Sequence, residues 1–267
     1  MIPLTDDLIS VIMPAYQAAN TLERSVRSVI SQSWTNWELL LLVDAASDQT
    51  ELIAKNMASE DHRIRLIVSS QNRGVVRTRN LGIRLAKGNF IAFCDSDDFW
   101  ITDKLENQMQ LLRKTNANFC YTSAVYLRLD LNWKSAPARM PTRLTLKRLL
   151  MGNPIGMSTV LMDIRSLGKF YFEALPAPYV HEDYAYWVRL FSQQNVQTVY
   201  LKAPTTEVSI HLHTRSGNKW LALKSQHFIL RTIAGQHRLK AGFFILSYVL
   251  LALHKRGLNA WIRQMFR

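Results

Sequence analysis

Three carboxylates crowd into the sequence FCDSDDFW, where Asp95, Asp97 and Asp98 follow an almost uninterrupted apolar run. Carboxylates this close repel each other and raise each other's pKa unless a cation or strong hydrogen-bond donors compensate. Mg²⁺ and Mn²⁺ prefer oxygen ligands and are typically held by one or two carboxylates together with substrate phosphate oxygens. The spacing therefore predicts a site for a divalent cation and a diphosphate.

These acids also have a structural interpretation. Asp95 and Asp98 could cap a helix that begins near Thr102 and interact with its positive N-terminal end. So short a pattern, taken by itself, favours the helix cap over the metal. A second acidic pair raises the same question, because Glu182 and Asp183 stand directly before a helical apolar face formed by Tyr184, Trp187, Val188 and Phe191. Their spacing leaves two roles open. The acids could only interact favourably with the positive N-terminal end of the helix, or they could also take part in proton transfer.

The first half of the chain alternates apolar runs with amphipathic segments. Strands are predicted over residues 8–16, 37–45, 64–70 and 89–95, and helices over residues 20–34, 47–58 and 74–88. Asn20 and either Ser47 or Asp48 are expected as N-caps, and Gly88 is expected to end the third helix. This alternation predicts a mostly parallel sheet with helices on both faces.

The predicted sheet gathers polar residues at the edge where its strands end. Ligands of such sheets bind in the crevice beyond the carboxyl ends of the strands. Pro14, Ala15 and Tyr16 end the first strand, Asp44 ends the second and Asp95 ends the fourth. The acidic run therefore lies where a ligand is expected.

Three segments closely resemble the inverting glycosyltransferases of family 2, in particular bacterial enzymes of surface polysaccharide assembly: ISVIMPAYQAANTLERSVRSVISQSWTNWELLLLVDAASDQT, NRGVVRTRNLGIRLAKGNFIAFCDSDDFWITDKLENQ and HEDYAYWVRL. The resemblance runs in order from residue 8 to residue 219. It implies the Rossmann-like GT-A fold, a nucleotide-sugar donor and a divalent metal, Mn²⁺ or Mg²⁺. It also implies a catalytic domain over residues 1–219, with a nucleotide-binding half at 1–100 and an acceptor-side half at 101–219, followed by a helical region at 220–267.

The resemblance assigns a role to individual positions of this sequence. The nucleotide-binding residues that it implies are Pro14, Ala15, Tyr16, Asp44, Arg79 and Asp95. Asp97 corresponds to the metal ligand, and His211 matches a family position near the diphosphate and metal. Asp183 corresponds to the catalytic base, with Glu182 and Trp187 on the acceptor side. Residues 126–157 are expected to contribute to acceptor binding as well.

The implied reaction is a single in-line displacement that inverts the anomeric carbon. A metal at Asp97 would stabilise the charge that develops on the leaving diphosphate. Asp183 would take the proton of the attacking acceptor hydroxyl. No covalent enzyme nucleophile is required, in agreement with a sequence in which we find no serine or cysteine motif for one.

Two turns depart from the family's pattern. Gln17 stands where the family usually has Asn after Pro-Ala-Tyr, and Asp44-Ala45-Ala46-Ser47 replaces Asp-Asp-Gly-Ser. Without Gly at position 46, positive φ is less accessible at this turn, so weaker base contacts are expected. The departures bear on donor identity more than on the reaction. They also keep open a catalytically silent relative that binds nucleotide without transferring sugar.

The net charge of +13 is concentrated in the C-terminal region, because Glu207 is the last acidic residue. Residues 241–253, AGFFILSYVLLAL, form an apolar run of 13. A transmembrane helix needs roughly 20 such residues, so this run cannot span a bilayer alone. Basic residues flank it on both sides: Arg238, Lys240, Lys255, Arg256, Arg263 and Arg267. The pattern predicts a helix lying on an anionic membrane surface, with a packed C-terminal helix as the alternative.

The remaining features favour an enzyme of the cytoplasm. The aromatic residues of the tail lie within the apolar run rather than between basic residues, which argues against a nucleic-acid-binding protein. Cys94 and Cys120 lie in apolar stretches without CxxC spacing, as expected of core residues in a reducing compartment. The N-terminus lacks the pattern of a signal peptide. We expect a peripheral enzyme at the inner face of the cytoplasmic membrane whose acceptor, as the resemblance implies, is a lipid-linked saccharide.

Overall fold

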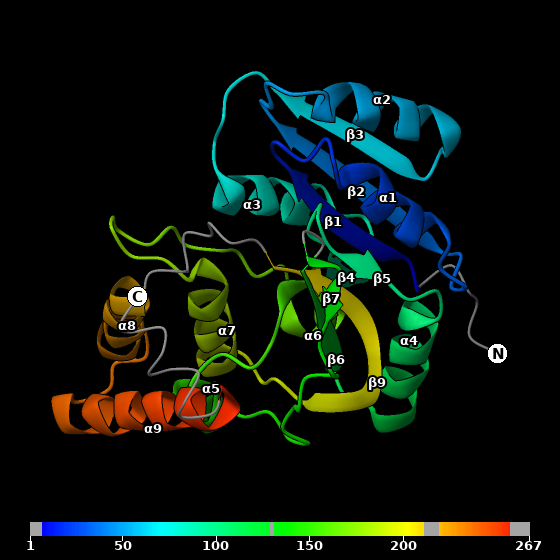
Figure 1. Cartoon of the computed structure of the whole chain (residues 1–267). Helices are drawn as coiled ribbons and strands as arrows, with labels where there is room; N and C mark the ends of the chain where they lie inside the picture. Colours follow the sequence, from blue (N-terminus) through cyan, green and yellow to red (C-terminus); the bar gives the residue numbers. More distant parts are fainter. Residues whose placement is uncertain (1–6, 129–130, 211–218, 257–267) are drawn as a thin grey trace. The chain divides into compact units, whose positions relative to one another are not determined.

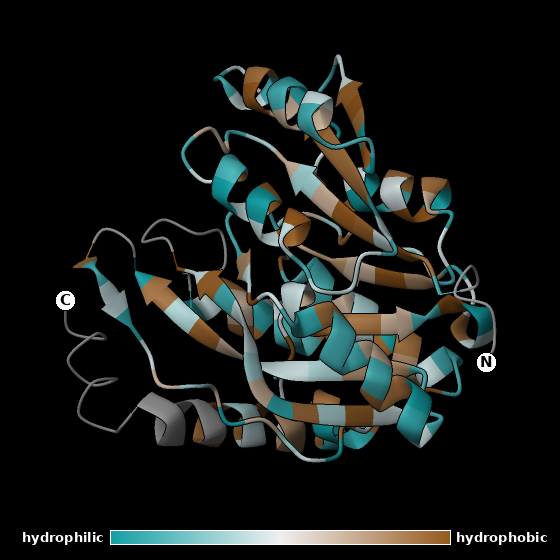
Figure 2. Cartoon of the chain, turned by 90° about the vertical axis from the view of Figure 1, so that its right-hand side faces the viewer, coloured by the Kyte–Doolittle hydropathy of each residue, from teal (hydrophilic) through white to brown (hydrophobic). Residues whose placement is uncertain are grey.

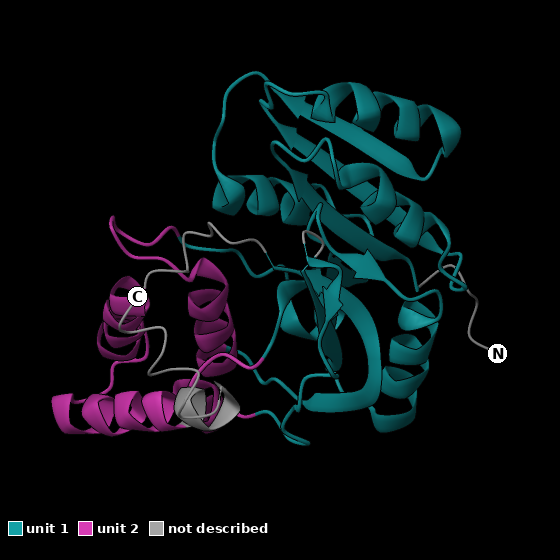
Figure 3. Ribbon diagram, in the orientation of Figure 1, with its two compact units in different colours: residues 1–144, 155–173, 194–212 teal, residues 145–154, 174–193, 213–267 magenta. Residues whose placement is uncertain are grey.

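The computed structural model of the chain describes residues 7–128, 131–210 and 219–256. The chain divides into two compact units, which Figure 3 colours separately. The sheet unit comprises residues 1–144, 155–173 and 194–212, and the helical unit comprises residues 145–154, 174–193 and 213–267. The boundaries of these compact units differ from the functional boundary predicted at residue 219. That functional division stays a prediction.

All the strands of the described residues join one sheet in the sheet unit, in the order β3-β2-β1-β4-β8-β6-β9-β5 with β7 paired to β6 (Figure 1). The pairs β1–β2, β2–β3, β1–β4 and β6–β9 are parallel, and the other pairs are antiparallel. The strands are β1 (Ile9–Ala15), β2 (Trp37–Asp44), β3 (Ile64–Ser69), β4 (Phe90–Phe93), β5 (Phe99–Trp100), β6 (Phe119–Arg128), β7 (Trp133–Lys134), β8 (Val160–Asp163) and β9 (Thr198–Ser209). The four strands predicted in the first half are confirmed as β1 to β4, including their parallel arrangement.

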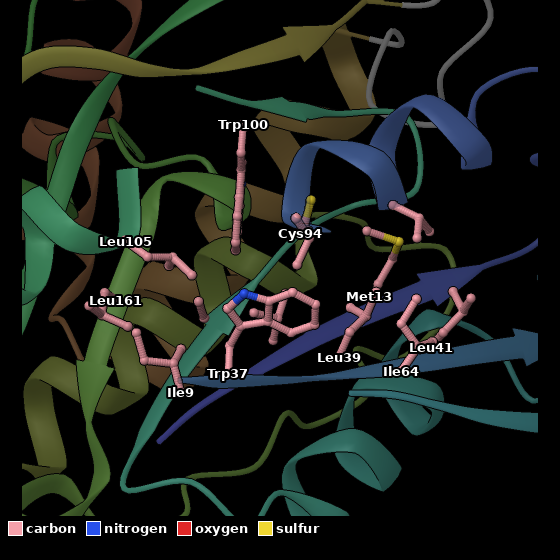
Figure 4. Close-up of a cluster of buried hydrophobic side chains, with 14 of the residues drawn as sticks. Ile9, Met13, Trp37, Leu39, Leu41, Ile64, Cys94, Trp100, Leu105 and Leu161 are labelled. Atoms are coloured by element: carbon pink, nitrogen blue, oxygen red, sulfur yellow. The ribbon is translucent and has the colours of Figure 1, made fainter. Parts of the chain in front are cut away.

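Helices pack on both faces of this sheet. The helices of the sheet unit are α1 (Leu22–Ile30), α2 (Thr50–Glu60), α3 (Val75–Leu85), α4 (Lys104–Thr115), η3 (Met157–Thr159) and α6 (Ile164–Leu167). One buried cluster joins apolar side chains of β1 and β2 to those of α1, α2 and α4, and Figure 4 shows Trp37 among its members. Figure 2 shows some strands of the sheet mostly in the brown of hydrophobic residues and others in paler or teal colours, whereas the covering helices carry both brown and teal. Strands β1, β2 and β4 are buried on both faces, and the helices bury one face.

Helix α3 packs on the opposite face, where Gly82 allows a close approach. A Cβ at this position would lie 2.5 Å from Cγ2 of Ile12 and 3.2 Å from Cδ1 of Leu42. Contacts that short do not occur between real carbon atoms, so only glycine fits against these two strands. The close packing fixes the helix whose first turn carries part of the candidate site.

The predicted helix boundaries need three corrections. Thr21 rather than Asn20 precedes α1, and its side chain makes no capping hydrogen bond. Gln49 precedes α2, although Asp48 Oδ1 does accept a hydrogen bond from the backbone N–H of Thr50 at 3.0 Å. Helix α3 ends at Leu85, three residues before Gly88. Sequence patterns locate helix ends only to within about two to four residues, and none of these differences is larger.

The helical unit contains α5 (Leu146–Leu150), α7 (Glu182–Gln193), α8 (Lys219–Phe228), the π-helical turn η5 (Ile229–Ile233) and α9 (Arg238–Arg256). Helix α9 buries one face, on which Ala241 is 0% and Phe244 8% exposed. Its opposite face is apolar but exposed, with Leu239 at 81%, Phe243 at 59%, Leu246 at 58% and Leu250 at 56%. We call these four side chains the α9 stripe.

Candidate active site

Asp44 joins the end of β2 to the start of α3. Its carboxylate accepts hydrogen bonds from the backbone N–H groups of Arg73 and Gly74, both at 2.8 Å. Asn72 Oδ1 accepts a further hydrogen bond from Gly74 N–H at 3.0 Å. Gly74 has a φ of +79°, a conformation that favours glycine. Asp44 is 4% exposed, so its carboxylate is a rigid, buried acceptor at the sheet edge where a ligand is expected.

A cavity of about 490 Å³ opens beside this carboxylate, between β2, β3 and α3. Leu42 and Ile67 form part of its apolar floor, and Asn72, Arg73 and Arg77 are among its polar lining residues. Asn72 and Arg73 were not predicted from the sequence as site residues. The signal available for them was the Asn-Arg-Gly run after β3, because Asn and Gly both favour turns and Gly readily adopts a positive φ.

The turns after β1 and β2 lie side by side. Ala15 pairs with Val43 in the parallel register, and Gln17 Nε2 donates to Ser47 Oγ at 2.7 Å. Tyr16 is 52% exposed, so its ring is available to a ligand above the strand ends. The predicted nucleoside residues Pro14, Ala15, Tyr16 and Asp44 are therefore neighbours in the structure.

The prediction for the turn after β2 was wrong in its position. Gly was expected to matter at residue 46, but the residue with positive φ is Ala45, at +50°. Gln17 also has a positive φ, at +49°. Both residues lie in the left-handed region, which costs an L-residue roughly 1–2 kcal/mol. The two turns keep this backbone without glycine, and the hydrogen bond between Gln17 and Ser47 connects them.

Arg79 of α3 and Asp95, which follows β4, form an ion pair. Arg79 Nη2 donates to Asp95 Oδ1 at 2.6 Å, and the arginine is only 7% exposed. The Arg79 guanidinium also lies 5.6 Å from the centre of the Phe172 ring. The backbone N–H of Asp95 donates to Ser158 Oγ at 3.0 Å. These contacts position Asp95, whose carboxylate remains 32% exposed, at the end of β4.

The three crowded acids have different environments. Asp98 is 4% exposed and accepts a hydrogen bond from the backbone N–H of Ser209 at 3.1 Å. Burial first, and then the charges of Asp95 and Asp97, raise the pKa of Asp98 well above its usual value. Asp95 and Asp97 are half-buried. Asp98 therefore anchors the acidic loop to β9, whereas Asp95 and Asp97 reach solvent.

The helix-cap interpretation of these acids is wrong. Strand β5 separates Asp98 from α4, which begins at Lys104 with Asp103 as its N-cap residue. Among the described residues, no group of three or more His, Cys, Asp and Glu side chains forms a complete metal cage. Mg²⁺ and Mn²⁺ commonly bind one or two carboxylates and take their other ligands from phosphate and water, so the half-buried pair Asp95 and Asp97 fits such an ion. His211 lies outside the described residues.

Asp183 lies in the first turn of α7, in the helical unit. Its Oδ2 accepts a hydrogen bond from Asn153 Nδ2 at 3.1 Å. His181, directly before the helix, has a φ of +76°, and its backbone carbonyl oxygen accepts a hydrogen bond from the N–H of Ala185 at 3.1 Å. Trp187 is 0% exposed, and its acceptor-side role stays a prediction. Glu182 is half-buried beside Asp183.

The sequence profile of the family described as "Glycosyl transferase family 2" matches residues 10–166. The chain belongs to glycosyltransferase family 2. Two curated relatives match this family 2 glycosyltransferase along nearly its whole length. The Escherichia coli UDP-Glc:alpha-D-GlcNAc-diphosphoundecaprenol beta-1,3-glucosyltransferase WfgD is 32% identical over 257 residues, which cover 96% of this chain and 98% of that protein. The putative teichuronic acid biosynthesis glycosyltransferase TuaG of Bacillus subtilis is 30% identical over 249 residues, covering 93% and 97%.

Solved structures share the fold of this family 2 glycosyltransferase. S. aureus TarS 1-349 in complex with UDP-GlcNAc aligns with a TM-score of 0.70 at 18% identity, over 90% of this chain and 71% of that chain. The mannosyltransferase PcManGT from Pyrobaculum calidifontis, in complex with GDP-Man and Mn²⁺, aligns with a TM-score of 0.60 at 15% identity, over 97% and 78%. The expected GT-A fold is thereby confirmed.

Proposed function

We propose that this glycosyltransferase moves a sugar from a nucleotide-diphosphate donor to a hydroxyl of a lipid-linked saccharide, with inversion, during assembly of a bacterial surface polysaccharide. The proposal rests on acidic side chains at one edge of the sheet: Asp44 ends β2, and Asp95 and Asp97 follow β4. Arg79 of α3 is paired with Asp95 there. The acceptor class is drawn from WfgD, whose name specifies a diphosphoundecaprenol-linked substrate.

The donor nucleotide would lie along this edge. Asp44 offers a fixed acceptor to a base N–H group, because two backbone N–H groups already hold its carboxylate in place. The exposed Tyr16 ring offers a stacking surface for the base. Arg79 and Asp95 would then face the ribose and the diphosphate.

A divalent metal, Mn²⁺ or Mg²⁺, would be held by Asp97 with Asp95 nearby, and we assign His211 as a further ligand. Bound there, the ion supplies Lewis-acid stabilisation of the charge on the leaving diphosphate. Asp98, buried and hydrogen-bonded to Ser209, holds the loop that carries these two acids. The arrangement explains why three acids share so short a segment.

Asp183 is proposed to take the proton of the acceptor hydroxyl, with Glu182 on the acceptor side. A carboxylate held in one orientation is suited to this step, because proton transfer requires hydrogen-bond reach between base and hydroxyl. Residues 101–219 would supply the acceptor side, and residues 1–100 the donor side.

The test uses the full chain with a panel of nucleotide sugars and Mn²⁺. The wild type should hydrolyse or transfer from one donor, and excess EDTA should stop it. Asp97→Ala should lose turnover, whereas Asp183→Asn should bind donor nucleotide normally while transfer falls by about a hundredfold or more. Turnover that is unaffected by EDTA and by Asp97→Ala would contradict the metal role. Nucleotide binding without turnover of any donor would favour the silent relative.

The proposal also includes association with an anionic membrane surface. No helix among the described residues is long and apolar enough to cross a bilayer. The α9 stripe, in contrast, exposes four large apolar side chains along one helix face. Arg238 and Lys240 flank Leu239 in sequence and therefore project about 100° to either side of the stripe. An apolar face bordered by basic residues fits the interface of an anionic leaflet, where a lipid-linked acceptor would lie.

A further inference from the structure

We propose that Asn153 is a positioning residue for the catalytic carboxylate of Asp183. The inference rests on the proposed function, in which Asp183 accepts the proton of the acceptor hydroxyl. Asn153 Nδ2 donates to Asp183 Oδ2 at 3.1 Å, and both residues belong to the helical unit. An ionised carboxylate only accepts hydrogen bonds, so the amide N–H group is complementary to the form of Asp183 that acts as a base.

The loop that carries Asn153 has a restricted backbone. Gly152 has a φ of +135°, and a Cβ at this position would lie 2.9 Å from the Tyr248 ring of α9. Glycine is therefore needed both for the conformation and for the space. Pro154 follows directly, and a proline disfavours the helical conformation of the residue before it. Asn153 is thus placed between a packed glycine and a proline.

A buried hydrogen-bond network joins this loop to the helix that carries Asp183. Tyr184 Oη donates to the carbonyl oxygen of Leu149, which precedes the loop by three residues, at 2.9 Å. Gln226 Nε2 donates to Tyr184 Oη at 3.0 Å and contacts the Leu150 carbonyl oxygen at 3.4 Å. Tyr184 is 2% and Gln226 3% exposed. The end of α5 and the start of α7 are therefore held together next to the Asn153–Asp183 contact.

These contacts assign separate tasks to the residues. The network around Tyr184 sets the distance between the loop and α7, and Asn153 then selects one orientation of the Asp183 carboxylate. A base must lie within hydrogen-bond reach of the proton that it removes, so a carboxylate free to rotate spends less time in a productive orientation. Loss of the Asn153 amide should therefore lower turnover without changing donor binding.

The experiment compares Asn153→Ala, Asn153→Asp and the control Gln193→Ala, which removes an exposed amide at the other end of α7. Loss of a hydrogen bond to a charged group should lower kcat of both Asn153 variants about 10- to 100-fold. The nucleotide Kd and the donor KM should stay at wild-type values, as should every parameter of the control. Asn153→Asp has the shape of asparagine but cannot donate when ionised, so it tests donation even if Asn153→Ala fails to fold.

A double variant separates this inference from the proposed function. If Asn153 acts through Asp183, then Asn153→Ala should cause little further loss in an Asp183→Asn background, because coupled residues are not additive. Normal kcat in Asn153→Asp, or additive losses in the double variant, would overturn the positioning role while Asp183 remains the base. Normal transfer by Asp183→Asn would instead contradict the proposed base itself.

Discussion

The α9 stripe yields a quantitative prediction of membrane binding. Complete burial of a leucine or phenylalanine side chain is worth about 1.5–3 kcal/mol. Phe243 and Leu246 are 59% and 58% exposed, so more than half of this free energy is still available to each. Replacing both by serine should remove roughly 2–3 kcal/mol of apolar transfer free energy, which lowers the vesicle partition coefficient about 30- to 100-fold.

The assay is co-sedimentation of the full chain with vesicles that contain phosphatidylglycerol. Leu52→Ser is the matched control, because Leu52 is also 58% exposed but lies on α2 of the sheet unit. It should pellet like the wild type. Vesicles of neutral lipid should bind the wild type less, since each basic residue near an anionic surface contributes about 1 kcal/mol.

Equal pelleting of the wild type and Phe243→Ser/Leu246→Ser would refute the membrane role of the stripe. Size-exclusion chromatography distinguishes the remaining explanation. If the stripe instead joins two copies of the chain, the wild type should elute as a dimer and the double variant as a monomer, with vesicle binding unchanged.

Two further predictions concern stability. Lys104 is fully buried at 0% exposure, and burial lowers its pKa from 10.5 to about 7. Between these values the unfolded chain holds more protons than the folded chain, so the free energy of unfolding should rise with pH by up to about 1.4 kcal/mol per unit. Urea titrations from pH 7 to 8, below the ordinary pKa of the buried thiols Cys94 and Cys120, should show a rise that Lys104→Met lacks; equal slopes would contradict the lowered pKa of Lys104. Ala45→Gly should relieve the left-handed strain at a φ of +50° and raise the free energy of unfolding by roughly 0.5–1 kcal/mol, measured by the same titration. A lower stability of this variant would show that glycine's greater freedom in the unfolded chain outweighs the strain.

The first half of the fold was predictable because its signals are local. Each strand from β1 to β4 is one apolar run, and each intervening helix has its own amphipathic period, so the parallel arrangement follows from their alternation. The second half depends on pairing between distant segments. Strand β6 pairs with β7, β8 and β9, and its register with β9 shifts on either side of Ser123. No local period in the sequence encodes such a shift.

The candidate site divides in the same way. Asp44 and Asp95 were predictable, since they end strands of a parallel sheet and ligands bind at that edge. Arg73 and Gly74 were missed because they act through backbone N–H groups, which have no side-chain signature. Asn153 was missed because its partner, Asp183, lies 30 residues away in the sequence. The one local signal was the run Gly152-Asn153-Pro154, which predicts a restricted, non-helical backbone around Asn153.

The three crowded acids differ in burial and in the groups that they contact. Asp98 is nearly inaccessible and accepts a hydrogen bond from the backbone N–H of Ser209, and burial raises its pKa well above the usual value. Asp95 balances the buried Arg79. A cation at Asp97 would lower the repulsion among all three, and its binding should therefore also stabilise the folded loop. The same crowding of negative charge would favour binding of the cation that we propose at Asp97.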